Sequence, residues 1–219
     1  MTPVQVYLGY DPRQPVAAQV AAHSLWQHAT CPVSITRLVL KTLPMTRRGL
    51  TDFTYARFLA PWLSDFAGVS IFLDSDVLVR GDVAELLAYP LSEPDTPVFV
   101  VQGPKKFEWA SVMVFNNARC LRLTPEFLDD RTQNPLTMAW ADAVGRLAPT
   151  WNHLVGYDAP NPDAKLVHFT QGIPIWPETK TCEFHEEWHA AARQSMSSVS
   201  FATLMGHSVH VAAMQKVGA

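Results

Sequence analysis

Two aspartates separated by one residue carry the strongest chemical signal in the sequence. Asp74 and Asp76 directly follow residues 69–73, a continuous apolar run of the length of a buried strand. Like charges this close raise each other's pKa unless a cation lies between them. Mn²⁺ or Mg²⁺, which prefer oxygen ligands, would satisfy the pair, above all while also binding a diphosphate. We therefore predict a divalent-metal site here; a solvated pair of loop acids is the alternative.

A histidine far along the chain is a candidate third ligand. His168 lies in the apolar run 166–169, where a lone histidine is usually a core residue bonded to the backbone. Imidazole and carboxylate together suit Mn²⁺, so His168 is also a candidate ligand beside Asp74 and Asp76. The separation of these residues along the chain does not choose between the two interpretations.

The elements that must position these residues alternate in the manner of an α/β protein. Strands are expected at residues 4–8, 34–40, 69–73, 97–102, 111–115 and 166–169. Helices are expected from Pro15 to the Cys31-Pro32 pair, within 51–66, and at 124–130, 136–144 and 186–193. Alternation in the front half predicts a mainly parallel sheet that binds ligands at the carboxyl ends of its strands.

Composition sets the broad class of the protein. The 219 residues are 48% hydrophobic and 17% charged, which excludes an intrinsically disordered chain and fits a single domain over residues 1–219. The net charge of −3, without a basic cluster, excludes nucleic acid and an anionic membrane as partners. Three scattered cysteines, no signal-peptide pattern and no expected transmembrane segment favour a cytoplasmic protein.

Several blocks of the sequence resemble a known enzyme family. Tyr-Leu-Gly-Tyr-Asp at 7–11, Tyr-Ala-Arg-Phe at 55–58, and residues 71–86 around the Asp-Ser-Asp are similar to successive blocks of the family 8 glycosyltransferases. That family includes glycogenin and bacterial lipopolysaccharide galactosyltransferases. Residues 112–116, 151–152, 166–169 and Trp176 continue the resemblance in the same order. It therefore spans about residues 4–176.

The resemblance implies an α/β fold of the GT-A type, a single domain with a mixed, mainly parallel central sheet flanked by helices. It implies retaining transfer of a sugar from a nucleotide-sugar donor, expected to be a UDP-sugar, to a carbohydrate, glycolipid or protein acceptor. Mn²⁺ or Mg²⁺ would bind Asp74, Asp76 and His168. Asp11 would face the nucleobase, and Arg57 the diphosphate or donor sugar. The substrate-binding set that the resemblance implies is Gly9, Asp11, Arg57, Ser75 and Gly172.

The sequence departs from the family pattern at two places. Pro174 stands where the family has a lysine that contacts phosphate, so we expect either weaker donor binding or another cation, such as Arg13, in its place. The family's Asp-Gln pair before Trp151 is missing, and we assign no catalytic nucleophile.

Three alternatives remain open at this point. Asp74 and Asp76 also resemble the first motif of haloacid-dehalogenase-like phosphotransferases. The chain could instead be a nucleotide-sugar-binding protein without transfer activity. Finally, His185 and His189 match the His-Glu-x-x-His pattern of zinc proteases.

Overall fold

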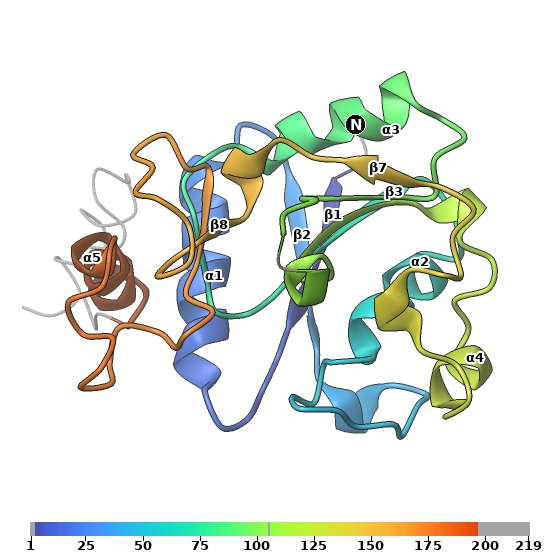
Figure 1. The fold of residues 1–219 in the computed structure, drawn as a ribbon, viewed down its shortest axis with the longest axis horizontal. Helices are drawn as coiled ribbons and strands as arrows, with labels where there is room; N and C mark the ends of the chain where they lie inside the picture. Colours follow the sequence, from blue (N-terminus) through green and yellow to red (C-terminus); the bar gives the residue numbers. More distant parts are fainter. Residues whose placement is uncertain (1–2, 105, 197–219) are drawn as a thin grey trace, which may run out of the picture.

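The computed structural model describes residues 3–104 and 106–196, and a six-stranded sheet forms its frame (Figure 1). The strand order is β2-β1-β3-β6-β5-β7. Pairs β1–β2, β1–β3 and β5–β7 are parallel, whereas β6 is antiparallel to β3 and β5, so the expected mixed, mainly parallel sheet is confirmed. The strands are β1 Val4–Gly9, β2 Val33–Leu38, β3 Val69–Leu73, β5 Val98–Val100, β6 Val112–Asn116 and β7 Val144–Arg146.

Burial on both faces explains why the central strands are continuous apolar runs. Successive side chains of a strand point to opposite faces, so Phe72 of β3 joins one hydrophobic cluster while Ile71 and Leu73 join another. All three side chains are fully buried. Ser70, the one polar residue of β3, is also buried, and its hydroxyl donates to Asn117 Oδ1 at 2.7 Å; β3 ends directly before Asp74.

A second, three-stranded sheet in the order β4-β9-β8 places the candidate third ligand. Its strands are β4 Val77–Val79, β8 His153–Leu154 and β9 Leu166–His168. β4 is antiparallel to β9 with Val77 opposite His168, and the Phe169 amide donates to the Asp76 carbonyl at 2.9 Å. This register sets His168 beside the residue that precedes β4, which is Asp76.

Helices cover the sheets and connect them. α1 Pro15–His28 begins with a proline at its first turn, a position where the missing amide costs no hydrogen bond. α1 packs between the strands and α5 His185–Met196, which carries the buried Trp188 (Figure 1). The other α-helices are the short α2 Ala60–Leu63, α3 Ala88–Ser92 and α4 Pro125–Asp129. None of the helices in residues 3–104 and 106–196 is long and apolar enough to cross a bilayer.

Short 3-10 helices occupy many connections. They are η1 Leu40–Thr42, η2 Ala56–Leu59, η3 Val83–Leu87, η4 Lys106–Glu108, η5 Asn117–Arg119, η6 Pro135–Thr137 and η7 Pro149–Trp151.

The expected helix at 136–144 is wrong. The chain there forms η6, turns through Met138 at φ 61°, and becomes extended at β7, which pairs with β5. Trp140 is buried in the core, and its indole donates to the Pro135 carbonyl at 3.1 Å. The apolar residues at helical spacing therefore contact the core from a turn and not from one face of a helix. Within 51–66 only residues 56–63 are helical, and the strand expected at 34–40 ends at Leu38.

Candidate functional site

Three side chains converge where β3 ends. Asp74, Asp76 and His168 each offer one ligand atom, and these atoms lie within 4.8 Å of one another. His168 Nε2 is 3.4 Å from Asp76 Oδ1. Asp74 and His168 are buried, while 28% of the Asp76 side chain is exposed, so the group is reached from the Asp76 side. No other group of three such ligands was found among residues 3–104 and 106–196.

The electrostatics of this cluster favour a cation. Burial raises the pKa of Asp74 to about 7, even though the Arg57 guanidinium lowers it. Burial alone would lower the pKa of His168, but the carboxylates of Asp76, Asp74 and Glu108 raise it to about 9. At neutral pH a proton on His168 therefore offsets part of the surplus negative charge. A divalent cation would displace that proton, because a metal ligand must be the neutral imidazole.

An orphaned carboxylate oxygen of Asp74 supports such a cation. Asp74 Oδ1 and Arg57 Nε are buried and make no hydrogen bond in the described part of the chain. Arg57 Nη2 approaches Asp74 Oδ1 to 3.2 Å without the alignment of a hydrogen bond. A buried polar atom without a partner is costly and needs an explanation. Two carboxylates and an imidazole, with one carboxylate oxygen unsatisfied, suit Mn²⁺ or Mg²⁺.

Arg57 lies behind Asp74. Only 7% of the residue is exposed, and its Nη1 donates to the Ala110 carbonyl at 2.8 Å. The guanidinium carbon lies 5.3 and 5.2 Å from the ring centroids of Phe53 and Phe72. Arg57 is thus held in a narrow slot as the counter-charge of Asp74. Its expected contact with the donor stays a prediction.

The structure pairs Asp11 with the cation expected to replace the family lysine. Arg13 Nε donates to Asp11 Oδ1 at 2.9 Å and Nη2 to Oδ2 at 2.6 Å, and this hydrogen bonding lowers the pKa of Asp11. Both carboxylate oxygens are thereby occupied, while 66% of the Arg13 side chain is exposed. A ligand that used either side chain would have to share or open this pair.

The remaining expected substrate-binding residues lie in loops or at strand ends. The local structure already explains why glycine occurs at two of these positions. A Cβ on Gly9 would lie 2.8 Å from the ring of Phe53, so packing alone requires glycine there. Gly172 has φ 117°, which a side chain would strain. Ser75 is buried between Asp74 and Asp76. Donor contacts by these residues stay predictions.

The zinc-protease pattern does not build a site. His185 Nδ1 lies 2.7 Å from the Cys182 carbonyl, and Glu187 pairs with Arg80 at 2.8 Å. No third ligand converges on His185 and His189 among the residues that the structure describes. The motif lies on α5, which is anchored on α1 through Trp188.

One curated relative decides the family. Protein CDI of Arabidopsis thaliana is 30% identical over an alignment of 224 residues, which covers 85% of this chain and 85% of that protein. The chain belongs to the family of Protein CDI. No protein-family model matches the sequence.

Solved structures with a similar backbone place this chain in the GT-A glycosyltransferase fold. The galactosyltransferase LgtC, in complex with donor and acceptor sugar analogs, matches with a TM-score of 0.60 and 14% identity over 91% of this chain and 99% of its own. GlyE of Streptococcus pneumoniae matches with a TM-score of 0.66 and 18% identity over 90% of this chain. The bifunctional glycosyltransferase WbbM matches with a TM-score of 0.62 and 18% identity over 87%. The chain spans 50% of WbbM and 61% of GlyE.

Two residues that the sequence left without a role surround His168. His168 Nδ1 lies 3.1 Å from Asn152 Oδ1, and Asn152 Nδ2 donates to the Glu108 carbonyl at 3.3 Å. Because the amide nitrogen faces a carbonyl, the amide oxygen must face the imidazole, and Nδ1 must carry a hydrogen. Nε2 is then the atom directed at Asp76. Such a partner orients a ligating histidine and sets its tautomer.

Glu108 is the second missed residue. It is 7% exposed, and its carboxylate accepts hydrogen bonds from Thr170 Oγ1 at 2.5 Å and Ser111 Oγ at 2.7 Å. Its Oε2 is 3.6 Å from His168 Nδ1. Asn152 could have been noticed because the Trp151-Asn152 pair belongs to the family resemblance, whereas no pattern around Glu108 marks it.

Replacing Asn152 by Ala is expected to lower the affinity for Mn²⁺ by about 10–100-fold, because the imidazole loses the acceptor that holds Nε2 toward Asp76. Titration with Mn²⁺ followed by the EPR signal of the free ion measures this. The matched control is Asn134→Ala, an exposed asparagine outside the cluster, which should leave the affinity unchanged. Unchanged Mn²⁺ affinity in Asn152→Ala would remove Asn152 from the site.

Proposed function

We propose that the chain is a metal-dependent, retaining glycosyltransferase that moves a sugar from a nucleotide-sugar donor, a UDP-sugar, to a carbohydrate, glycolipid or protein acceptor in the cytoplasm. The observation that carries the proposal is the convergence of Asp74, Asp76 and His168 at the carboxyl end of β3. The GT-A fold supports it, and so does LgtC, whose structure holds donor and acceptor sugar analogs.

Different residues would have different roles in such a reaction. Asp74, Asp76 and His168 would hold Mn²⁺ or Mg²⁺, which neutralises the charge that develops on the leaving nucleoside diphosphate. Arg57 keeps Asp74 in place and compensates its charge. Asn152 keeps His168 Nε2 directed at Asp76. We further propose that Gly9, Asp11, Ser75 and Gly172 line the donor.

The fold favours this function over the phosphotransferase alternative. A nucleophilic Asp74 would have to reach a substrate phosphate, yet Asp74 is buried and faces Arg57. The GT-A likeness also points away from that class. A nucleotide-sugar-binding protein without transfer activity would have the same fold, so a measurement of activity separates these two functions.

Incubation with a panel of UDP- and other nucleotide sugars and Mn²⁺ tests the proposal. We expect release of the nucleoside diphosphate for one donor, and loss of that release in excess EDTA. Hydrolysis of phosphomonoesters without nucleotide-sugar turnover would favour the phosphotransferase. Tight nucleotide-sugar binding without turnover against a broad acceptor panel would favour the binding protein.

A further inference from the structure

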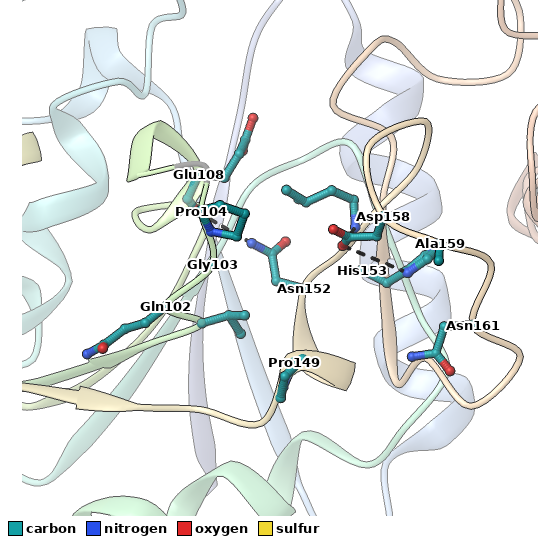
Figure 2. A pocket seen from close by; sticks show the side chains of 12 residues that line it. Gln102, Gly103, Pro104, Glu108, Pro149, Asn152, His153, Asp158, Ala159 and Asn161 are labelled. Carbon is teal, nitrogen blue, oxygen red and sulfur yellow. Dashed lines mark hydrogen bonds and ion pairs between the residues drawn. The ribbon is translucent and has the colours of Figure 1, made fainter.

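A pocket of about 340 Å³, drawn in Figure 2, adjoins the cluster of Asp74, Asp76 and His168, because two of its lining residues contact His168. It is formed by the segment that follows β5 and by the segment around β8. The two sites share Asn152, which lines the pocket and bonds His168, and Glu108, whose carboxylate is 3.6 Å from His168. Its lining is Val101, Gln102, Gly103, Pro104, Glu108, Pro149, Asn152, His153, Leu154, Asp158, Ala159 and Asn161.

The sheet order sets this pocket on the far side of the cluster from Asp11. Along the edge where β1, β3 and β5 end, Asp11 follows β1, Asp74 follows β3, and the pocket segment follows β5. β6 lies between β3 and β5 and begins at this same edge, because Leu73 is opposite Val112 and Val100 is opposite Met113. A donor placed over Asp11 and the cluster would therefore leave this pocket to a second substrate.

The charge of the pocket disfavours an anionic ligand. The lining contains the carboxylates Glu108 and Asp158 and no lysine or arginine. A cation contacts the lining at Gln102, where Arg146 Nη2 donates to the side-chain oxygen at 3.3 Å. Asn152 and Asp158 face one another in the pocket (Figure 2). A phosphate or carboxylate would meet these two acids with no lysine or arginine among the lining residues, so the lining disfavours an anion and suits a ligand that donates hydrogen bonds, such as a neutral polyol.

The polarity of the pocket, and two exposed aromatic residues next to its lining along the chain, point to a sugar. Its walls combine apolar side chains with amides and two carboxylates, the mixture that small polar ligands use. Phe107 and Tyr157, which adjoin lining residues Glu108 and Asp158, are 63% and 45% exposed, and their ring centroids are 6.5 Å apart. Exposed aromatic rings with a polar neighbour offer an apolar face to the C–H side of a sugar ring.

We propose that this pocket binds a neutral sugar residue of the acceptor, with Phe107 and Tyr157 as its stacking rim. The role of the bound sugar as the acceptor rests on the proposed glycosyltransferase function, whereas the binding of a neutral sugar rests on the pocket alone. It makes Asp158 and the amide side chains the groups that bond the sugar hydroxyls.

Saturation-transfer NMR with methyl β-D-galactopyranoside, methyl α-D-glucopyranoside and glucose 6-phosphate tests the pocket in the full chain, with and without Mn²⁺ and UDP. We expect millimolar binding of at least one neutral glycoside, and binding of glucose 6-phosphate at least about 10-fold weaker. Phe107→Ala should weaken the glycoside about 5–10-fold. Ala159→Trp, which fills the pocket from an exposed position, should abolish it.

The matched control is Leu121→Ala. Leu121 is as exposed as Phe107, at 63%, but follows the far end of β6. It should leave glycoside binding unchanged, and all variants should keep Mn²⁺-dependent UDP binding. The proposal is overturned by preference for the phosphate, by no binding of either glycoside, or by undiminished binding in Ala159→Trp. If the unaltered protein does not bind UDP in the presence of Mn²⁺, that result would instead contradict the proposed function.

Discussion

Asp76→Asn is expected to lower Mn²⁺-dependent nucleotide release by about 10²–10³-fold, because the leaving diphosphate loses the cation that stabilises it in the transition state. Asp76 supplies a charged ligand from a partly exposed position, and the His168 imidazolium holds its pKa below the ordinary value despite burial. The substitution keeps the size of the side chain and removes its charge. Binding of Mn²⁺ and of the nucleotide sugar should weaken together, since each ligand raises the affinity for the other.

Mn²⁺ titration, donor binding and the increase of Tm on adding Mn²⁺ measure these effects. Asp142→Asn is the control, because Asp142 is exposed and precedes β7 at the opposite edge of the sheet. The variant should remain folded, because Asp76 is not in the hydrophobic core. Unchanged Mn²⁺ affinity in Asp76→Asn would contradict the proposed metal site.

Arg57→Met is expected to lower the free energy of unfolding by about 3–5 kcal/mol at pH 8, because it leaves the buried Asp74 carboxylate without its counter-charge. The side chains of Arg57 and Asp74 are only 9% and 11% exposed. Denaturant unfolding of the metal-free protein measures the change. The matched control, Arg48→Met, removes an arginine that is 72% exposed and 3.8 Å from Asp52, and should cost less than about 1 kcal/mol.

The loss should be smaller at acid pH. Asp74 has a pKa raised to about 7, and removal of Arg57 raises it further. A raised carboxyl pKa destabilises the folded protein as the pH climbs from the unfolded value near 3.8 through the folded one. At pH 5 the carboxyl takes up a proton in the folded state, which removes most of the unpaired charge. The double variant Arg57→Met/Asp74→Asn should recover stability at pH 8.

Arg57→Lys separates stability from donor contact. It retains the charge beside Asp74 but not the guanidinium fork, so we expect weaker donor binding or slower turnover in a folded protein. Unchanged kinetics in Arg57→Lys would show that Arg57 serves Asp74 alone.

The pattern of apolar residues along the chain was sufficient to predict the elements that are buried along their whole length. β1, β3, β6 and α1 were predicted close to their observed bounds, because strands covered on both faces are largely apolar and Pro15 marks the start of α1. The same pattern predicted where β3 ends and hence where Asp74 and Asp76 stand. It was wrong at 136–144, where buried Met138 and Trp140 belong to a turn whose contacts come from distant segments.

The amino-acid sequence by itself therefore determined the fold class and the two carboxylates, since both depend on neighbours along the chain. Only the tertiary structure decided that His168 joins them, because the β4–β9 register is a long-range pairing that spacing does not encode. The same holds for Asn152, which follows η7, and Glu108, which ends η4, because they reach His168 from separate segments of the chain. A site of this kind is built from strand ends and loops that converge in space, so its second layer becomes visible only once those segments are packed together.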